Sequence, residues 1–398
     1  MFSWRRSRAP AVPGKADFMT DSSEKTYRVG ISGSYGGLNM GDEAILESII
    51  TQLRSSLRAR ITVFSRNPRD TLARYAVERS VPVRDLTKSE VAQEISDLDL
   101  FIFGGGGILF DREAPVFLRE VMIAHELGVP VMVYAVSAGP LTQRSVQNLV
   151  RDALNQAAEV TVRERGAKKI LEEAGVEKDI VVTADPALLL DPQPVDCGTL
   201  SHEHLSGKRI LVGMSVREPG PAAPDIDPDY YHSLLANAAD FIIDRFEASI
   251  VFVPMERETQ DMQHSHAVIA KTLRPQYCSV LREEYTPGQL LDIMQHFDFA
   301  VGMRLHFLIF AALTGVPFLG LPYSSKVLNF LKDLEMETPP LNLVSAGRLI
   351  AYIDHFWDTR ESLRQHIRQM IPEMKKRALA TNRIAVSLLT GRHGVKTA

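Results

Sequence analysis

Short apolar segments alternate with longer amphipathic segments along most of the chain, from about residue 28 to residue 321. The apolar segments have the length of strands, and the amphipathic segments repeat their apolar residues at helical spacing. This alternation is typical of α/β proteins, in which helices connect the parallel strands of a sheet. The first set of apolar segments predicts strands at 28–32, 61–64, 98–103, 129–136 and 159–163, and a further one from Ile180. A helix is predicted from about Ala44 to Leu57, after the first strand.

A polar stretch rich in proline and glycine, residues 191–208, interrupts the alternation. We interpret it as a linker between a domain at 27–190 and a second domain at 209–345. The second set predicts strands at 209–216, 250–255, 278–281, 297–301 and 316–321. A helical segment, 346–398, follows, and its long helix at 360–389 is expected to pack back across both domains.

Two glycine-rich segments follow predicted strands of the first domain. The segment 33–42 lacks the glycine spacing of a dinucleotide fingerprint, and Asp42 at the next helix start opposes a phosphate there. It is therefore either a tight turn with an acidic cap or a close approach to a neutral ligand such as a sugar, with Asn39 and Asp42 as hydrogen-bond partners. The run Gly104 to Gly107 is expected to line a cleft, with Gly105 and Gly106 near a ligand and Asp111 as a further polar contact.

Cations gather where predicted strands of the second domain end. Arg304 and His306 lie between the strand ending at Val301 and the next helix, and Lys326 follows the next strand. The carboxyl ends of parallel strands share one edge of a sheet, where ligands bind. Helix-opening N–H groups with Arg304 and Lys326 predict a site for phosphate or carboxylate. The alternative is that Arg304 and His306 cap the helix and pair with nearby carboxylates.

Three further charged residues end predicted strands. Arg163 and Arg217 could face the same edge or form ordinary surface ion pairs, and Asp185 could contact a ligand or only terminate its strand. His264 and His266 are expected to be exposed helix residues that point apart, so no metal site is predicted from them.

Charge and composition restrict the class of protein. The formal net charge of −4 argues against a dedicated nucleic-acid binder, and two distant cysteines, Cys197 and Cys278, predict neither a disulfide framework nor a metal site. We expect a cytoplasmic protein. Residues 1–26 are interpreted as a flexible tail, whose three arginines could at most make peripheral contact with an acidic membrane surface.

Taken together and in order, several motifs resemble the polysaccharide pyruvyltransferase family. The motifs are Asn39-Met40-Gly41-Asp42-Glu43, Gly104-Gly105-Gly106-Gly107, Ser137-Ala138-Gly139-Pro140, Val162-Arg163-Glu164, Ala184-Asp185-Pro186 and Gly302-Met303-Arg304-Leu305-His306. The resemblance extends from about residue 33 to residue 326. It implies two Rossmann-like domains facing across a cleft, similar to the B-type glycosyltransferase fold.

The resemblance also implies a reaction. Pyruvate would pass from phosphoenolpyruvate, a co-substrate and not a bound cofactor, to a sugar of a bacterial exopolysaccharide or cell-wall polymer precursor, forming a cyclic ketal and releasing phosphate. The acceptor would be attached to a lipid carrier at the inner face of the membrane.

The resemblance assigns a side of the cleft to each domain. Arg163 and Arg304 would bind the donor and stabilise the departing phosphate, His306 would be the general acid, and Lys326 would assist in binding the anion. From their positions in the sequence, we expect Gly302 on the donor side and Asn39, Asp42, Gly105, Gly106 and Asp185 on the acceptor side. The family usually has an aspartate-proline or similar pair just before the lysine, whereas this chain has Ser324-Ser325. Two alternatives stay open, a nucleotide-sugar-dependent glycosyltransferase and a non-catalytic member of a polysaccharide-assembly complex.

Overall fold

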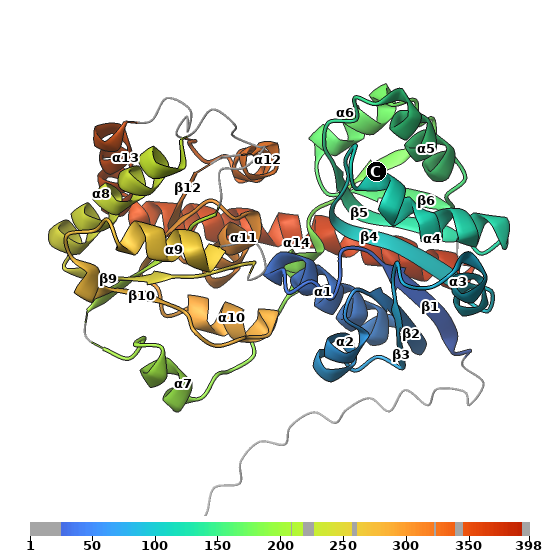
Figure 1. Cartoon of the computed structure of the whole chain (residues 1–398), viewed down its shortest axis with the longest axis horizontal. Coiled ribbons are helices and arrows are strands. Elements are labelled where there is room, and N and C mark those ends of the chain that lie inside the picture. Colours follow the sequence, from blue (N-terminus) through green and yellow to red (C-terminus); the bar gives the residue numbers. More distant parts are fainter. Residues whose placement is uncertain are drawn as a thin grey trace, which may run out of the picture.

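The computed structural model describes residues 25–207, 209–217, 227–256, 261–321, 324–338 and 345–391. Nearly all of the predicted tail, together with Lys208 of the predicted linker and the end of the C-terminal segment, lies outside these residues. The described chain forms two halves, each built on its own parallel sheet (Figure 1). Two Rossmann-like sheets are the architecture predicted from the sequence.

The first half contains a seven-stranded sheet of order β3-β2-β1-β4-β5-β6-β7. Its strands are β1 (Tyr27–Ser32), β2 (Ala59–Ser65), β3 (Arg79–Pro82), β4 (Leu100–Leu109), β5 (Val131–Ala138), β6 (Glu159–Val162) and β7 (Ile180–Val182). Its helices are α1 (Met40–Ser56), α2 (Pro68–Arg74), α3 (Lys88–Ile95), α4 (Ala114–Glu126), α5 (Arg144–Asn155), α6 (Arg165–Glu173) and the 3₁₀ helix η1 (Pro186–Leu189). Because every pairing is parallel, the strand ends that follow β1, β4, β6 and β7 share one edge.

The second half contains a five-stranded parallel sheet of order β10-β9-β8-β11-β12. Its strands are β8 (Ile210–Ser215), β9 (Ala248–Phe252), β10 (Cys278–Val280), β11 (Phe299–Gly302) and β12 (Phe318–Gly320). Its helices are α7 (Cys197–His202), α8 (Pro228–Phe246), α9 (Asp261–Ile269), the 3₁₀ helix η3 (Pro275–Tyr277), α10 (Pro287–Met294), α11 (Leu305–Thr314) and α12 (Ser325–Asp333). The short helix α7 lies inside the segment that was interpreted as a linker.

Two C-terminal helices, α13 (Ala346–Asp358) and α14 (Arg360–Thr390), complete the described chain. Figure 1 shows α14 running behind both halves. Asn382 donates to the carbonyl of Gln52 in α1 at 3.2 Å, and Arg364 donates to the carbonyl of Gly315 in the second half at 3.2 Å. The expectation that this helix packs across both domains is confirmed.

The glycine run was expected to follow its strand as a loop, but it lies inside the strand. Gly104 to Gly107 continue β4, which pairs with β1 on one side and β5 on the other. Gly105 and Gly106 have φ values of +74° and +82°, which favour glycine because they are strained for other residues. The run therefore bends a central strand where α1 and α12 approach it.

Other boundaries also differ from the prediction. Helix α1 begins at Met40, whereas the apolar pattern predicted Ala44, because the Asn39 side chain caps the helix by accepting from Gly41 N at 3.0 Å. The elements α2, β3 and α3 fill a region for which the sequence predicted nothing. No described helix has the length and apolar character needed to cross a membrane.

Candidate functional site

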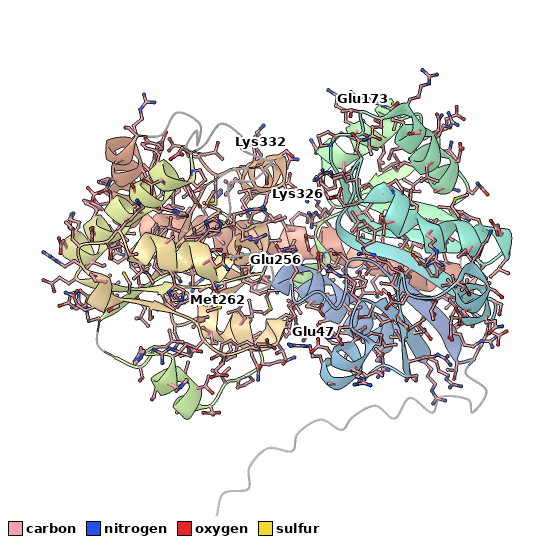
Figure 2. All side chains as sticks on the ribbon, in the orientation of Figure 1. Glu47, Glu173, Glu256, Met262, Lys326 and Lys332 are labelled. Carbon is pink, nitrogen blue, oxygen red and sulfur yellow. The ribbon has the colours of Figure 1, made fainter. Side chains whose placement is uncertain are left out.

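The carboxyl-terminal edges of the two sheets meet around the first turns of α1, α11 and α12. At this junction, Asn39 and Glu256 form an isolated antiparallel bridge between the halves, and Met40 N donates to Met255 O at 2.8 Å. Figure 2 shows Glu256 and Lys326 on the side of the second half that faces the first half. The candidate site is built from side chains that reach across this junction.

His306 extends from the first turn of α11 toward the first half of the molecule. Its Nε2 lies 3.4 Å from Oδ2 of Asp185, which follows β7. The imidazole ring also covers Gly41 of α1, where an added Cβ would lie 1.9 Å from Nδ1. The histidine is therefore enclosed by the first half, and its side chain is only 13% exposed.

Lys326, in the first turn of α12, also reaches the first half. Its ammonium lies 4.5 Å from the centre of the Phe110 ring and so close to Gly107 that a Cβ there would come within 2.0 Å of Nζ. Burial lowers the pKa of Lys326 to about 8, and the positive charges of Arg163 and Arg217 act in the same direction, while the carboxylates of Glu164 and Asp42 oppose the shift. A bound anion would offset both effects, so the amine is placed to receive one.

Arg304 is already paired with two carboxylates. It donates through Nε to Asp261 Oδ2 at 3.0 Å and through Nη2 to the other oxygen of the same carboxylate, and its Nη1 lies 2.9 Å from Glu256 Oε2. The Asp261 side chain is fully buried, whereas Glu256 is 21% exposed. These contacts match the alternative in which Arg304 pairs with nearby carboxylates. Of the two carboxylates, Glu256 is the one that a ligand could displace.

Arg163 occupies a similar setting in the first half. Its Nη1 donates to Asp185 Oδ2 at 2.6 Å and its Nε donates to Glu164 Oε2 at 3.1 Å, with the guanidinium buried. Ser137 donates to the other oxygen of Glu164. These contacts use two edges of the guanidinium, and Nη2 takes part in neither of them.

Asp42 lies in the first turn of α1, close enough to His306 and Lys326 for their charges to act on its carboxylate. Its Oδ1 would be 2.8 Å from a Cβ added to Gly106, so the absence of a side chain at that glycine leaves room for this carboxylate. Burial raises the pKa of Asp42, and His306 and Lys326 oppose this shift. A carboxylate with a raised pKa beside two cationic groups is suited to accept a proton.

The other predicted site residues have different surroundings. Asn39 uses its side-chain oxygen to cap α1, and the Cβ direction of Gly105 points at Ile45, within 2.0 Å of its Cγ2. Gly302 ends β11, and an added Cβ would lie 2.4 Å from Phe307, so this glycine allows α11 to pack closely. The Asp111 carboxylate is used within the first half, where Oδ2 accepts from the backbone N of Thr142 at 2.9 Å and from its hydroxyl at 2.6 Å.

Several contacts at the site were missed in the sequence. Gly41 and Phe110 contact the side chains that arrive from the second half, and Asp261 and Glu256 fix Arg304. Phe110 could have been found, because it lies three residues after the glycine run. The two carboxylates could not, since nothing in their local sequence connects them with a residue more than 40 positions away.

The prediction that His264 and His266 are exposed helix residues was partly wrong. His264 is not an isolated exposed residue, because its Nδ1 lies 2.8 Å from Nε2 of His232 in α8. Within the described ranges, no group of three or more His, Cys, Asp or Glu side chains could hold a metal ion.

The fold defines a class of α/β proteins that are built on two parallel sheets. Several solved structures share the fold at low sequence identity. A putative UDP-N-acetylglucosamine 2-epimerase from Listeria monocytogenes is 12% identical, with coverage of 94% of this chain and 98% of that chain and a TM-score of 0.66. Anabaena Alr3699/HepE in complex with UDP-glucose is 12% identical, with coverage of 92% and 100% and a TM-score of 0.62.

The sequence comparisons define the family. The family model for polysaccharide pyruvyl transferase matches residues 39–325, so the chain belongs to this family. A curated relative is the amylovoran biosynthesis protein AmsJ of Erwinia amylovora, which is 21% identical over 325 residues covering 77% of each chain. The resemblance noted in the sequence is confirmed, and the matched region includes Arg163, Arg304 and His306.

Proposed function

We propose that this protein transfers the pyruvyl group of phosphoenolpyruvate to a sugar of a bacterial polysaccharide precursor, forming a cyclic ketal and releasing phosphate. Membership of the pyruvyl transferase family and the relation to an exopolysaccharide biosynthesis protein support transfer onto a polysaccharide. The observation that carries the choice of donor is Lys326, a largely enclosed ammonium whose pKa is lowered to about 8 beside further cations. Such a group gains most from a small, multiply charged anion.

Phosphoenolpyruvate fits the distribution of charge at the junction. It carries a phosphate and a carboxylate on a three-carbon frame, so it requires at least two cationic contacts. Lys326 would bind one anionic group together with Arg163, whose Nη2 takes no part in the hydrogen bonds to Asp185 and Glu164. Arg304 would meet the other group after Glu256 withdraws, since Asp261 is the buried and fixed partner.

The chemistry proceeds in two steps that balance. A hydroxyl of the sugar attacks C2 of phosphoenolpyruvate, the C=C bond opens, and C3 takes a proton from His306 to become a methyl group. A second hydroxyl then attacks C2, and the C–O bond to phosphate breaks. Each hydroxyl loses its proton. Asp42, whose pKa is raised by burial, would accept the first, and the departing phosphate would take up the second. The cations stabilise the charge that develops on the departing phosphate.

The acceptor is proposed to approach from the first half, past α1 and the glycine run of β4. The carboxylate of Asp42 supplies a hydrogen-bond acceptor there, and the glycines leave room beside it. We propose a lipid-linked sugar as acceptor and a location in the cytoplasm at the inner face of the membrane.

An assay with purified protein tests the proposal. Phosphoenolpyruvate and a panel of lipid-linked sugars should yield phosphate and a new ketal methyl signal in equal amounts. Lys326→Ala and His306→Asn should lose most of this turnover. Lys332→Ala is the matched control, because Lys332 lies on the same helix α12 with an exposed side chain (Figure 2). Wild-type turnover in both site variants would show that the site is assigned to the wrong residues.

The same preparation distinguishes the glycosyltransferase alternative. Phosphoenolpyruvate alone should raise the midpoint of thermal unfolding, because a ligand that binds only the folded state stabilises it. Stabilisation by a nucleoside diphosphate and not by phosphoenolpyruvate would favour the alternative. Binding of phosphoenolpyruvate without phosphate release on any acceptor would favour a non-catalytic role.

A further inference from the structure

Asp185 is held firmly by its own half of the molecule. Its Oδ1 accepts from the backbone N of Ala187 at 3.0 Å, which caps η1, and its Oδ2 accepts from Arg163 Nη1 at 2.6 Å. Burial alone would raise the pKa of Asp185, but Arg163 and His306 outweigh it and hold that pKa well below its usual range. The residue is therefore a fixed anion.

The same carboxylate faces the histidine of the other half. Asp185 Oδ2 lies 3.4 Å from His306 Nε2, so one oxygen is shared between Arg163 and the imidazole. Asp185 is only 6% exposed. With one oxygen capping a helix and the other between two side chains, little of the carboxylate remains to bind a sugar hydroxyl.

We propose that Asp185 is a positioning residue for His306 and not a ligand of the acceptor. This inference rests on the proposed function, in which His306 supplies a proton to the donor. The carboxylate orients the ring through Nε2, while Gly41 leaves room for the ring at Nδ1. Arg163 fixes the carboxylate in turn, which adds a second role to its predicted contact with the donor.

The arrangement joins the two halves at the reacting group. Asp185 follows a strand of the first sheet, whereas His306 follows a strand of the second sheet. The charges facing the histidine are Asp185 after β7, with its counter-ion Arg163 after β6, and Asp42 from α1. His306 and the carboxylate that positions it are therefore close together only when the two halves are in contact.

Asp185→Asn tests the inference, because it keeps the shape of the side chain and removes its charge. We expect kcat to fall about 10- to 100-fold, as for other groups that orient a functional histidine. KM for phosphoenolpyruvate and for the acceptor should stay within about three-fold of wild type.

Asp196→Asn is the matched control. Asp196 also caps a helix, accepting from Thr199 N at 2.8 Å, but it is exposed and lies at α7. This variant reports the cost of losing a capping aspartate, and its kcat and both KM values should be those of wild type. Thermal unfolding of both variants shows whether Asp185→Asn is folded.

A double-variant cycle keeps the test decisive if Asp185→Asn is less stable. Adding Asp185→Asn to His306→Asn should cause little further loss, because a residue that acts through the histidine has nothing left to position. Losses that multiply, or a raised acceptor KM with unchanged kcat, would overturn the inference and leave the proposed function intact. Failure of the proposed function is recognised separately, because the wild-type protein would then form no ketal from phosphoenolpyruvate.

Discussion

Gly41→Ala is predicted to disable the site through a single methyl group. A Cβ at this position would lie 1.9 Å from Nδ1, 2.4 Å from Cε1 and 2.5 Å from Cγ of His306. Ordinary contact begins at 3.4 Å, so the ring and α1 must separate by about 1.5 Å (3.4 − 1.9). Misplacement of a reacting group by about 1 Å can cost roughly 100-fold in rate, and we expect kcat/KM for phosphoenolpyruvate to fall by about that factor.

The stability of the variant should change much less than its activity. Alanine is favoured over glycine inside a helix by about 0.5–1 kcal/mol, which offsets part of the strain. The assay is phosphate release with phosphoenolpyruvate and acceptor, accompanied by thermal unfolding. Gly347→Ala is the matched control, because Gly347 is likewise the second residue of its helix, α13, and a Cβ there would meet nothing within 4 Å.

The two glycine variants have clear opposing outcomes. Gly347→Ala should keep wild-type activity and gain slightly in stability. If Gly41→Ala also kept wild-type kcat/KM while remaining folded, the position of His306 against α1 would have no importance for turnover, and the reasoning would be refuted.

Three further predictions concern charged groups. Since Lys326 has a pKa of about 8, it is charged below that pH, and kcat/KM for phosphoenolpyruvate should fall as pH rises through 8. Lys326→Arg, if active, should lack this decline, because arginine keeps its charge. A decline that persists in this variant would exclude the lysine as its cause. Glu256→Gln should lower KM for phosphoenolpyruvate about two- to five-fold by removing a competing anion from Arg304, whereas an unchanged KM would mean that the donor does not displace this carboxylate. Burial raises the pKa of Glu47 to about 7, so folding binds a proton there and the stability of the protein falls as pH rises from about 4.5 to 7. Glu47→Gln should stabilise the protein by roughly 1–2 kcal/mol at pH 8, allowing for solvent screening, and by almost nothing at pH 4. An effect that does not depend on pH would contradict this.

The positions of the cations could be predicted from the sequence because they depend on local order. Apolar segments identified the strands, and Arg304 and Lys326 follow two strands that are neighbours in one parallel sheet. The edge of the sheet was therefore predictable. The ion-pair partners of Arg304 and His306 were not, because Asp261 and Asp185 reach these residues through tertiary packing.

The glycine residues show a second limit of sequence interpretation. Four glycines have low strand propensity, yet they remain in β4 because a central strand is hydrogen-bonded on both sides. Gly41 similarly delayed the predicted start of α1, since glycine is unfavourable in a helix interior. At Gly41 and in the glycine run, the missing side chain leaves room for a residue of the other half. Secondary-structure propensity does not reveal such a contact.

The most direct measurement is the product of the reaction carried out in D₂O. With phosphoenolpyruvate and a competent acceptor, we predict one phosphate for each ketal, and a ketal methyl group that carries one deuterium, because C3 takes a single solvent-derived proton from His306. The His306→Asn variant should form this product far more slowly. Phosphate released without a ketal, or a ketal methyl group free of deuterium, would contradict the account.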